Sequence, residues 1–371
     1  MEYKKLGDIA TFINGYAFKP SDRGEVGLPI IRIQDLTGNG YDLGFYNGEY
    51  PKKIEINNGD ILISWSASLG VYVWNNGKAL LNQHIFKVVF DKLEIDKYYF
   101  VFAIQYYLDE MKRKTHGATM KHIVKKDFDC TLIPYPSVEK QREISNILLK
   151  VKYIIDTRKK QLEKYDELIK ARFVEMFGNI TSDKYVSFSD ICIKITDGTH
   201  QPPKFTKKGI PFLFVSNVVT NKITYNTRKF ISSETYKELM KRTPVEIGDI
   251  LLSTVGSYGH PAIVKTDKKF CFQRHIAYLK PNNKIVNSTY MYSAILTDEL
   301  QNQIDERVNG VAQKTLNLSE IKKLQIPLPP LIQQNQFADF VKQIDKSKFV
   351  VQKSLDKAQL LFDSLMQEYF G

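Results

Sequence analysis

Two stretches of the chain repeat one another 189 residues apart, and this repeat constrains the fold more than any other feature. "GDILISWSASLG" covers residues 59–70 and "GDILLSTVGSYG" covers residues 248–259, with seven of the twelve positions identical. Unrelated stretches of this length share about one position. The chain therefore has to build the same local structure twice.

Further matches extend the repeat over the whole chain. "GLPIIRIQDL" (27–36) matches "GIPFLFVSNV" (209–218) at a separation of 182, and "NQHI" (82–85) matches "QRHI" (273–276) at 191. From residue 117 onward the separation stays at 193. Small loop insertions in the second copy explain why the separation between matching residues increases along the chain. The 371 residues are thus a tandem duplication of a unit of about 180 to 190 residues, a size typical of a domain with an appendage.

Each copy has the same two parts. Short β-rich runs, broken by Gly, Asn and Asp, come first, and the first copy also has a helical pattern near residues 95–114. The prolines of "IPYP" and "IPLPP" end this part. Residues 137–177 and 331–370 then contain neither Gly nor Pro, so each run can form one long helix. We expect an α+β chain with two mixed domains, residues 1–136 and 179–329, and two helical spacers, residues 137–178 and 330–371.

Apolar residues in both long helices recur with coiled-coil spacing. At about 1.5 Å per residue each helix would be a rod of about 57 Å, too long to bury its stripe on one small domain. Antiparallel pairing of the two helices, with the halves related by a local two-fold axis, is the natural solution. Two independent helices, each packed on its own domain, are the alternative. The residues expected to pair the helices are Ile144, Leu148, Val151, Ile155, Leu162, Ile169, Phe337, Val341, Ile344, Val351, Leu355, Phe362 and Leu365.

The charge of the chain favours a polyanionic partner. The 53 basic and 41 acidic residues leave a net charge of +12. Residues 1–178 carry 27 basic and 23 acidic side chains, and residues 179–371 carry 26 and 18, so both copies are positive. Two similar domains held at a distance suit duplex DNA, whose successive major grooves lie about 34 Å apart. Four extra residues in each helix would add about 6 Å, close to the rise of two base pairs.

Cysteine usage and hydropathy indicate a cytoplasmic protein. Cys130, Cys192 and Cys271 lie far apart, which suits neither a disulfide framework nor a four-ligand zinc site. The N-terminus "MEYKKLGDIA" has no apolar signal core. The longest apolar stretch, residues 98–108, is too short to cross a bilayer.

Residues that read bases should differ between the copies, whereas residues that support the fold should agree. The loops after the matched strands follow this pattern, because Trp65 and Ser66 stand where the second copy has Thr254 and Val255. Polar side chains there can pair with base edges, and lysines can bind phosphates. Ordinary loop divergence and solvated basic loops are the alternatives. The candidate DNA-contacting residues are Tyr16, Lys19, Arg23, Gln34, Asp35, Ser64, Trp65, Ser66 and Lys121 in the first copy, and Thr199, His200, Lys204, Ser216, Asn217, Thr254, Ser257 and Lys314 in the second.

No motif for catalysis is recognisable. "GVYVWNNGKA" (70–79) has six residues between its glycines and Ala79 where a P-loop has Ser or Thr. "QPPK" and "LPPL" lack the Asn or Asp and the following aromatic residue of a base-amino methyltransferase, and no HExxH spacing occurs among the six histidines. His84 and His275 match between the copies and read as structural histidines. The sequence therefore indicates a DNA reader with no catalytic, metal or cofactor site of its own.

The arrangement resembles the specificity subunits of type I restriction-modification systems. The likeness rests on "KKLGDIATFINGYAF", "GDILISWSASLG", "NQHIFKV" and "IPYPSVEKQREISNIL", and on their second-copy versions "SFSDICIKITDGTH", "GDILLSTVGSYG" and "IPLPPLIQQNQFADFVKQID". It covers essentially the whole chain. "PYPSVEKQ" and "LIQQ" depart from the double proline and acidic-Gln pair of the family, which affects only expected contacts at the helix starts.

The resemblance implies two target recognition domains, residues 1–136 and 179–329, each reading half of a bipartite site. It also implies two modification subunits that methylate adenine with S-adenosylmethionine, and motor-nuclease subunits that use ATP and magnesium; these cofactors belong to the partners. Two other classes stay open on the residues alone: a free-standing DNA-binding regulator, and a nuclease whose site is unrecognised.

Overall fold

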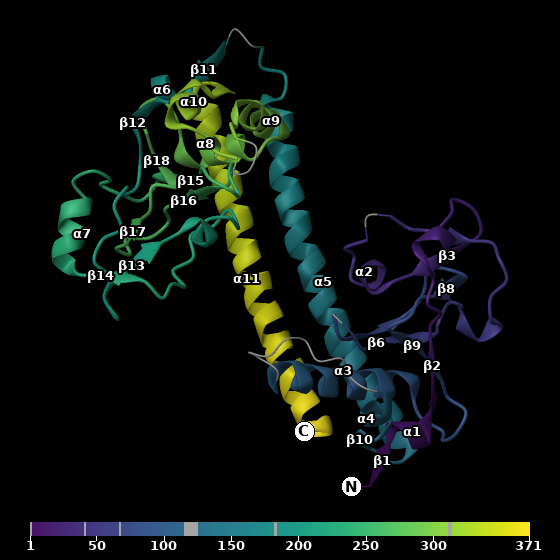
Figure 1. The fold of residues 1–371 in the computed structure, drawn as a ribbon. Helices are drawn as coiled ribbons and strands as arrows, with labels where there is room; N and C mark the ends of the chain where they lie inside the picture. Colours follow the sequence, from purple (N-terminus) through teal and green to yellow (C-terminus); the bar gives the residue numbers. More distant parts are fainter. Residues whose placement is uncertain (1, 41, 67, 115–124, 182–183, 311–313) are drawn as a thin grey trace. The chain divides into compact units, whose positions relative to one another are not determined.

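The computed structural model describes every residue except 1, 41, 67, 115–124, 182–183 and 311–313 (Figure 1). It divides into two compact units. Unit 1 is Met1–Lys159 with Lys353–Gly371, and unit 2 is Lys160–Gln352. Each unit therefore contains a mixed α and β domain together with one part of each long helix. The end of the C-terminal helix belongs to the same unit as the N-terminus.

Unit 1 is built from short strands and helices, as the sequence pattern predicts. One sheet has the order β2-β9-β6-β7, a second has the order β4-β3-β8-β5, and β1 pairs with β10. The predicted helix near residues 95–114 is α3. The strands are β1 (Tyr3–Lys5), β2 (Thr11–Asn14), β3 (Leu28–Ile31), β4 (Phe45–Tyr46), β5 (Glu55–Ile56), β6 (Ile61–Ser64), β7 (Gly70–Val73), β8 (Ala79–Leu81), β9 (Ile85–Val89) and β10 (Leu132–Pro134). The helices are α1 (Leu6–Ile9), α2 (Ile33–Leu36), α3 (Lys97–Lys114) and α4 (Lys125–Asp129), with 3-10 turns η1 (Pro20–Asp22) and η2 (Lys52–Ile54).

Unit 2 repeats this plan. Its sheets have the orders β12-β18-β15-β16 and β14-β13-β17, and β11 pairs with β19. Because β12, β18, β15 and β16 follow the order of β2, β9, β6 and β7, the duplication seen in the sequence is a duplication of the fold. The strands are β11 (Tyr185–Ser187), β12 (Cys192–Asp197), β13 (Ile210–Leu213), β14 (Phe230–Ile231), β15 (Ile250–Ser253), β16 (Pro261–Ile263), β17 (Cys271–Phe272), β18 (Ile276–Pro281) and β19 (Gln325–Pro327). The helices are α6 (Phe188–Ile191), α7 (Ser233–Leu239), α8 (Ser288–Ile295), α9 (Asp298–Arg307) and α10 (Leu318–Lys323), with the 3-10 turn η4 (Val215–Asn217).

The identical "GDIL" residues form a turn into a fully buried strand in both units. Gly59 and Gly248 have φ values of 92° and 97°, in the left-handed region that favours glycine. The Asp60 carboxylate accepts a hydrogen bond from the Asn57 N–H at 2.8 Å, and Asp249 accepts one from the Glu246 N–H at 2.7 Å. Strands β6 and β15 that follow are buried at all four positions. The shared residues are therefore those that the turn and the core require.

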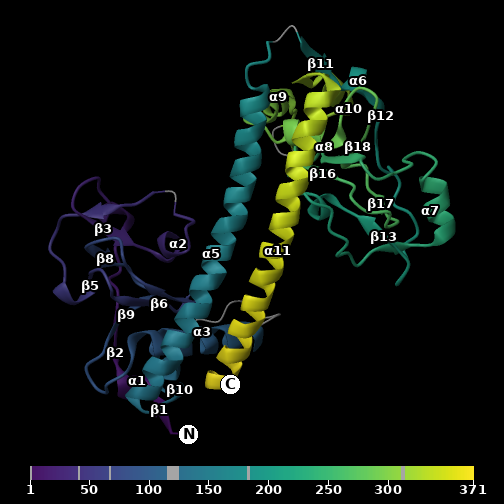
Figure 2. The same cartoon turned by 180° about the vertical axis from the view of Figure 1, so that it is seen from behind.

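Two long helices, α5 (Val138–Phe177) and α11 (Leu331–Phe370), lie side by side with opposite directions (Figure 2). In unit 2, Asp166 of α5 pairs with Lys348 of α11, while the ring of Phe173 lies 5.4 Å from that of Phe337. A later position in α5 thus meets an earlier position in α11, which makes the pair antiparallel. In unit 1, Leu148 and Met366 belong to one hydrophobic core.

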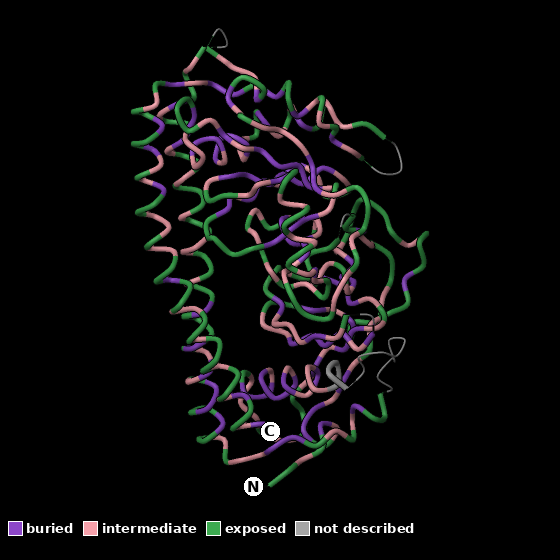
Figure 3. Tube along the Cα trace, turned by 90° about the vertical axis from the view of Figure 1, so that its left-hand side faces the viewer, coloured by how far each residue is buried: buried purple, intermediate pink, exposed green. Residues whose placement is uncertain are grey.

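The coiled-coil stripe predicted from the sequence is the inward face of both helices. Every predicted position, from Ile144 to Ile169 in α5 and from Phe337 to Leu365 in α11, is buried or half-buried. Buried and exposed positions alternate along both helices (Figure 3). Because the helices pack on each other as well as on the domains, the alternative of two independently packed helices is wrong.

Phe337 of α11 packs against α5 in unit 2. It is fully buried, and its ring lies 5.4 Å from Phe173 and 5.7 Å from Phe177. We expect Phe337→Ala to lower the free energy of unfolding by about 3 to 5 kcal/mol, because it leaves a cavity beside the rings of Phe173 and Phe177. Urea unfolding followed by circular dichroism measures this. Ile332→Ala, at an exposed position of the same helix, should change the free energy of unfolding by less than about 0.5 kcal/mol. Equal decreases for the two variants would contradict the packing of Phe337 against α5.

Candidate nucleic-acid interface

Three chain segments meet at one edge of the main sheet in each unit. In unit 2, β12 ends at Asp197 and β15 ends at Ser253, where β18 begins with Ile276. In unit 1, β2 and β6 end beside the start of β9 in the same register, with Asn14 opposite Phe86 and Ser64 opposite Ile85. We define the loop edge of unit 1 as residues 15–19, 65–69 and 82–84, and that of unit 2 as residues 198–204, 254–259 and 273–275. Residue 67 lies outside the described residues.

Backbone hydrogen bonds hold the loop edge of unit 2 together. The Arg274 N–H donates to the Thr199 carbonyl at 3.0 Å, and the Thr254 N–H donates to the His275 carbonyl at 3.0 Å. The Gly256 N–H donates to the Lys314 carbonyl at 3.1 Å, which adds Lys314 to this edge. The positions of these loops are therefore fixed by the fold.

The loop edge of unit 1 has the same frame. The Gln83 N–H donates to the Tyr16 carbonyl at 2.9 Å, and the Trp65 N–H donates to the His84 carbonyl at 3.3 Å. Tyr16, Trp65 and Gln83 correspond in this frame to Thr199, Thr254 and Arg274. The two edges thus share these two backbone hydrogen bonds and carry different side chains.

The predicted residues at positions 34–35 and 216–217 start close to these edges. The Asn82 N–H donates to the Ile31 carbonyl at 3.1 Å, at the end of the strand that precedes α2. The Gln273 N–H makes the same bond to the Leu213 carbonyl, also at 3.1 Å, just before η4. The structure therefore brings the turns α2 and η4 beside the loop edges. Gln34 and Ser216 are exposed there.

Several predicted residues lie at the surface. Tyr16 and Lys19 are exposed at the loop edge of unit 1. His200, Lys204, Ser257 and Lys314 are exposed at that of unit 2, and Thr199 is half-buried. Arg23 is also exposed, in the segment before β3. Lys121 lies outside the described residues.

Four predicted residues lie in the interior instead: Ser64, Ser66, Asn217 and Thr254 are buried. The Ser64 hydroxyl donates to the Ser68 carbonyl. The Asn217 amide donates to the Asn226 carbonyl at 3.0 Å and accepts from the Phe214 N–H at 2.9 Å. Small polar residues at strand ends satisfy buried backbone groups in this way. These residues shape the loops and offer no surface to DNA.

Asp35 and Trp65 are engaged by the protein itself. The Asp35 carboxylate lies 3.1 Å from Arg32 Nε, and both side chains are nearly buried. Trp65 is half-buried, and its ring stacks on Phe86 at 5.6 Å. Separating a nearly buried ion pair or exposing a packed indole costs free energy. We therefore interpret Asp35 and Trp65 as residues that support the loops.

The nearly buried Asp197 carboxylate holds two side chains, His200 and Arg242, at the loop edge of unit 2. The His200 Nε2 lies 2.8 Å from Asp197 Oδ2, and the Arg242 guanidinium pairs with the same carboxylate. The Arg242 Nε also donates to the Asp197 carbonyl at 3.2 Å. Asp197 is nearly buried, whereas His200 and Arg242 are about half exposed. A cavity of about 320 Å³ lies beside them, lined also by Thr199 and Phe272. The pair is pre-positioned for a phosphate or a base edge.

Sequence reasoning missed Arg242, and it also missed Gln83 and Arg274. Gln83 and Arg274 are exposed and occupy the same position of the frame, 191 residues apart. A signal was present, because "NQHI" and "QRHI" agree at His and Ile and differ at this position. Burial together with the nearby Arg274 lowers the pKa of His275, so that its neutral Nε2 accepts a hydrogen bond from Arg274 Nε at 3.2 Å. Arg242 has no comparable sequence signal.

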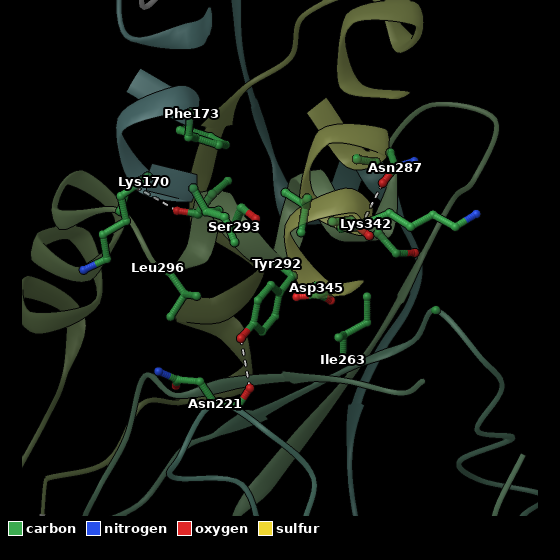
Figure 4. A pocket seen from close by; sticks show the side chains of 18 of the residues that line it. Lys170, Phe173, Asn221, Ile263, Asn287, Tyr292, Ser293, Leu296, Lys342 and Asp345 are labelled. Carbon is green, nitrogen blue, oxygen red and sulfur yellow. Dashed lines mark hydrogen bonds between the residues drawn. The ribbon is translucent and has the colours of Figure 1, made fainter. Parts of the chain in front are cut away.

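A cavity of about 1320 Å³ lies in unit 2 between the helix pair and the domain (Figure 4). The Tyr292 hydroxyl donates to the Asn221 carbonyl at 2.9 Å on its wall, and burial raises the pKa of Tyr292 to about 12. Five lysines and five carboxylates line this cavity, and Lys265 pairs with Asp345 at 2.6 Å. The lining therefore carries no excess of positive charge.

The fold and the loop edges define a class of protein: a duplicated DNA-recognition module carried on an antiparallel helix pair. A family model described as the type I restriction modification DNA specificity domain matches residues 1–164 and 184–358. The chain belongs to this family, and its role is that of a DNA sequence-specificity subunit. None of the described helices combines the length with the apolar character that a membrane span requires.

Known proteins resemble this chain over most of its length. The specificity subunit of the type I restriction enzyme EcoBI from Escherichia coli is 26% identical over 98% of this chain and 83% of its own length. The MjaVIII specificity subunit from Methanocaldococcus jannaschii is 24% identical over 79% of this chain and 74% of its own. The crystal structure of a type I restriction-modification S subunit from M. genitalium has the same fold, with a TM-score of 0.57, 14% identity and coverage of 100% and 96%. A chain from a structural study of type I complex assembly gives a TM-score of 0.54, with 16% identity and coverage of 99% and 97%.

Proposed function

We propose that this chain reads a bipartite DNA site, one half-site with each loop edge, across a gap of unread base pairs. The observation that carries this proposal is that the two loop edges share one backbone frame and expose different side chains. Equal frames present the loops to a groove in the same way, while different side chains pair with different base edges. Exposed cations such as Lys204 and Lys314 supply phosphate contacts.

Gln83 and Arg274 are the base-reading side chains of the two edges in this proposal. Both are exposed at equivalent positions, and each backbone is held by a hydrogen bond to the neighbouring loop. Gln pairs with the N6 and N7 atoms of adenine, and Arg pairs with the O6 and N7 atoms of guanine. We therefore assign an adenine contact to Gln83 and a guanine contact to Arg274.

Replacing Arg274 by Ala should remove the preference for guanine at one position of one half-site. A bidentate Arg–guanine pair contributes about 1 to 3 kcal/mol, so discrimination at that position should fall by about 5- to 150-fold. Methylation of a randomised DNA library by the reconstituted complex measures this preference position by position. The other half-site should not change.

Lys284→Ala is the matched control for Arg274→Ala. Lys284 is an exposed cation that follows the opposite end of β18. Its removal should leave every base preference as in the wild type. A uniform loss of methylation at all sequences after Arg274→Ala would instead identify a phosphate contact and contradict the assignment.

The chemistry belongs to partner subunits in this proposal, and the chain itself is non-catalytic. Two modification subunits transfer a methyl group from S-adenosylmethionine to adenine, and restriction subunits use ATP and magnesium. The long helices offer a docking surface, because both expose large apolar side chains to solvent. These are Tyr153, Ile154 and Val174 in α5, and Val350, Leu360 and Leu361 in α11. Adjacent exposed apolar residues, such as Tyr153 with Ile154 and Leu360 with Leu361, are candidates for such contacts.

Reconstitution tests the proposal against the two alternatives. Purified chain alone, and chain with modification subunits, are incubated with DNA and labelled S-adenosylmethionine. We expect methyl transfer only with the modification subunits. The stretch of DNA protected in a footprint should also be longer with these subunits than with the chain alone. Full binding by the chain alone, unchanged by the subunits, would indicate a regulator. DNA cleavage by the chain alone with a divalent metal would indicate a nuclease.

A further inference from the structure

A fully buried glutamine lies in the first turn of each long helix. Gln141 of α5 accepts a hydrogen bond from the Asp96 N–H at 2.9 Å and donates one to the Pro136 carbonyl at 2.9 Å. Both ends of its amide are thus used inside unit 1. The bonds join the start of α5 to the residue that precedes α3.

Unit 2 repeats this arrangement 193 residues later. Gln334 of α11 is also fully buried. It accepts from the Asn287 N–H at 2.8 Å and donates to the Pro329 carbonyl at 2.8 Å. Asn287 is the N-cap of α8, as Asp96 precedes α3. The same connection between a long helix and a short one therefore exists in both units.

A buried tyrosine adds a third bond in each unit. The Tyr99 hydroxyl donates to the Pro134 carbonyl at 2.9 Å, and the Tyr290 hydroxyl donates to the Pro327 carbonyl at 2.6 Å. Burial raises the pKa of both phenols well above their ordinary value, so both stay neutral donors. We call Tyr99 with Gln141 the helix anchor of unit 1, and Tyr290 with Gln334 the helix anchor of unit 2.

The helix anchors fix the direction in which each long helix leaves its domain. In unit 2 the carbonyls of Pro327 and Pro329 both accept hydrogen bonds from the helix anchor. The short segment between β19 and α11 therefore has little conformational freedom. Breaking such bonds leaves buried donors and acceptors without partners, which is costly. A helix of 40 residues is about 60 Å long, and a tilt of about 5° at its root moves the far end by about 5 Å. This exceeds the rise of one base pair, about 3.4 Å.

We infer that the helix anchors are positioning elements that restrict the complex to one length of the gap between half-sites. This inference rests on the proposed function. In it the two helix anchors keep the distance between the half-sites constant, and they do not read bases. The anchors lie in the domain interior, away from the loop edges, so the half-site sequences do not depend on them.

Gln334→Met tests the inference, because it keeps the side-chain volume and removes all the hydrogen bonds of the amide. Gln333→Met is the matched control, at an exposed glutamine of the same turn. Each variant is reconstituted with modification subunits, and methylation is measured on DNA with the native gap and with one or two base pairs more or fewer. We expect Gln334→Met to weaken the preference for the native gap by about five- to tenfold, with half-site preferences unchanged. Gln333→Met should behave as wild type.

The outcomes separate this inference from the proposed function. If Gln334→Met lowers methylation equally at all gaps, or keeps the wild-type preference, the anchors are only structural and the inference is wrong. If the wild-type complex shows no bipartite site, the proposed function fails first. Tyr290→Phe removes one hydroxyl and decides the question if Gln334→Met does not fold. Its gap preference should weaken in the same direction, and an unchanged preference would overturn the inference.

Discussion

Inserting four residues into both long helices should move the complex from its native site to a site with a wider gap. The insertions follow Lys159 in α5 and Gln352 in α11, where the two units meet along the chain. Four helical residues add about 6 Å, which corresponds to at most about two base pairs at 3.4 Å each. Methylation of the native site should fall to background, and a site with the same half-sites and a longer gap should replace it.

A loop insertion controls for damage caused by the added residues. The same four residues placed beside Val26, which is highly exposed in unit 1, should leave the gap unchanged. An insertion in only one helix should prevent folding, because it shifts one apolar stripe against the other. If both helices are lengthened and the gap stays the same, the helices do not set the distance between half-sites.

Exchange of unit 1 should replace one half-site completely. Residues 1–136 alone are not the unit, because Met366 and Phe370 of α11 lie in the same core. The Tyr106 hydroxyl donates to the Gln367 side chain at 2.9 Å, which also ties the two segments together. We therefore expect the best graft to carry residues 1–159 and 353–371, all of unit 1, from another member of the family. Sequencing of the methylated sites should show one new half-site and one retained.

A smaller graft and the reciprocal graft complete this experiment. A graft of residues 1–136 alone should change the same half-site but unfold at lower denaturant concentration, since foreign side chains would face Met366 and Phe370. A graft of residues 179–329 should change the other half-site. If either graft alters both half-sites, the two loop edges do not read independently.

The duplicated fold could be predicted because its requirements are local. Few residues can form a left-handed turn such as that at Gly59 or Gly248 and the buried strand after it. Both copies therefore have the same residues there. The long helices could be predicted for a similar reason, because a long apolar stripe with helical spacing and without Gly or Pro favours one continuous helix. The membership of residues 353–371 in unit 1 has no local signal, because it depends on contacts between distant segments.

The interface residues were only partly predictable. Divergence between the copies marked Trp65 and Thr254, yet Trp65 packs on Phe86 and Thr254 is buried. Two copies also diverge where their cores are packed differently, so divergence alone does not distinguish a reading residue from a packing residue. The same signal was present at Gln83 and Arg274, where exposure supports a reading role. Exposure was the missing information, and it requires the fold.

A base-resolution map of methyladenine in DNA treated with the reconstituted complex would decide whether this chain reads two separate half-sites. We predict one motif made of two specified half-sites, with a gap of constant length in which every base occurs. A single continuous motif, gaps of many lengths, or methylation by this chain without its partners would contradict that reading.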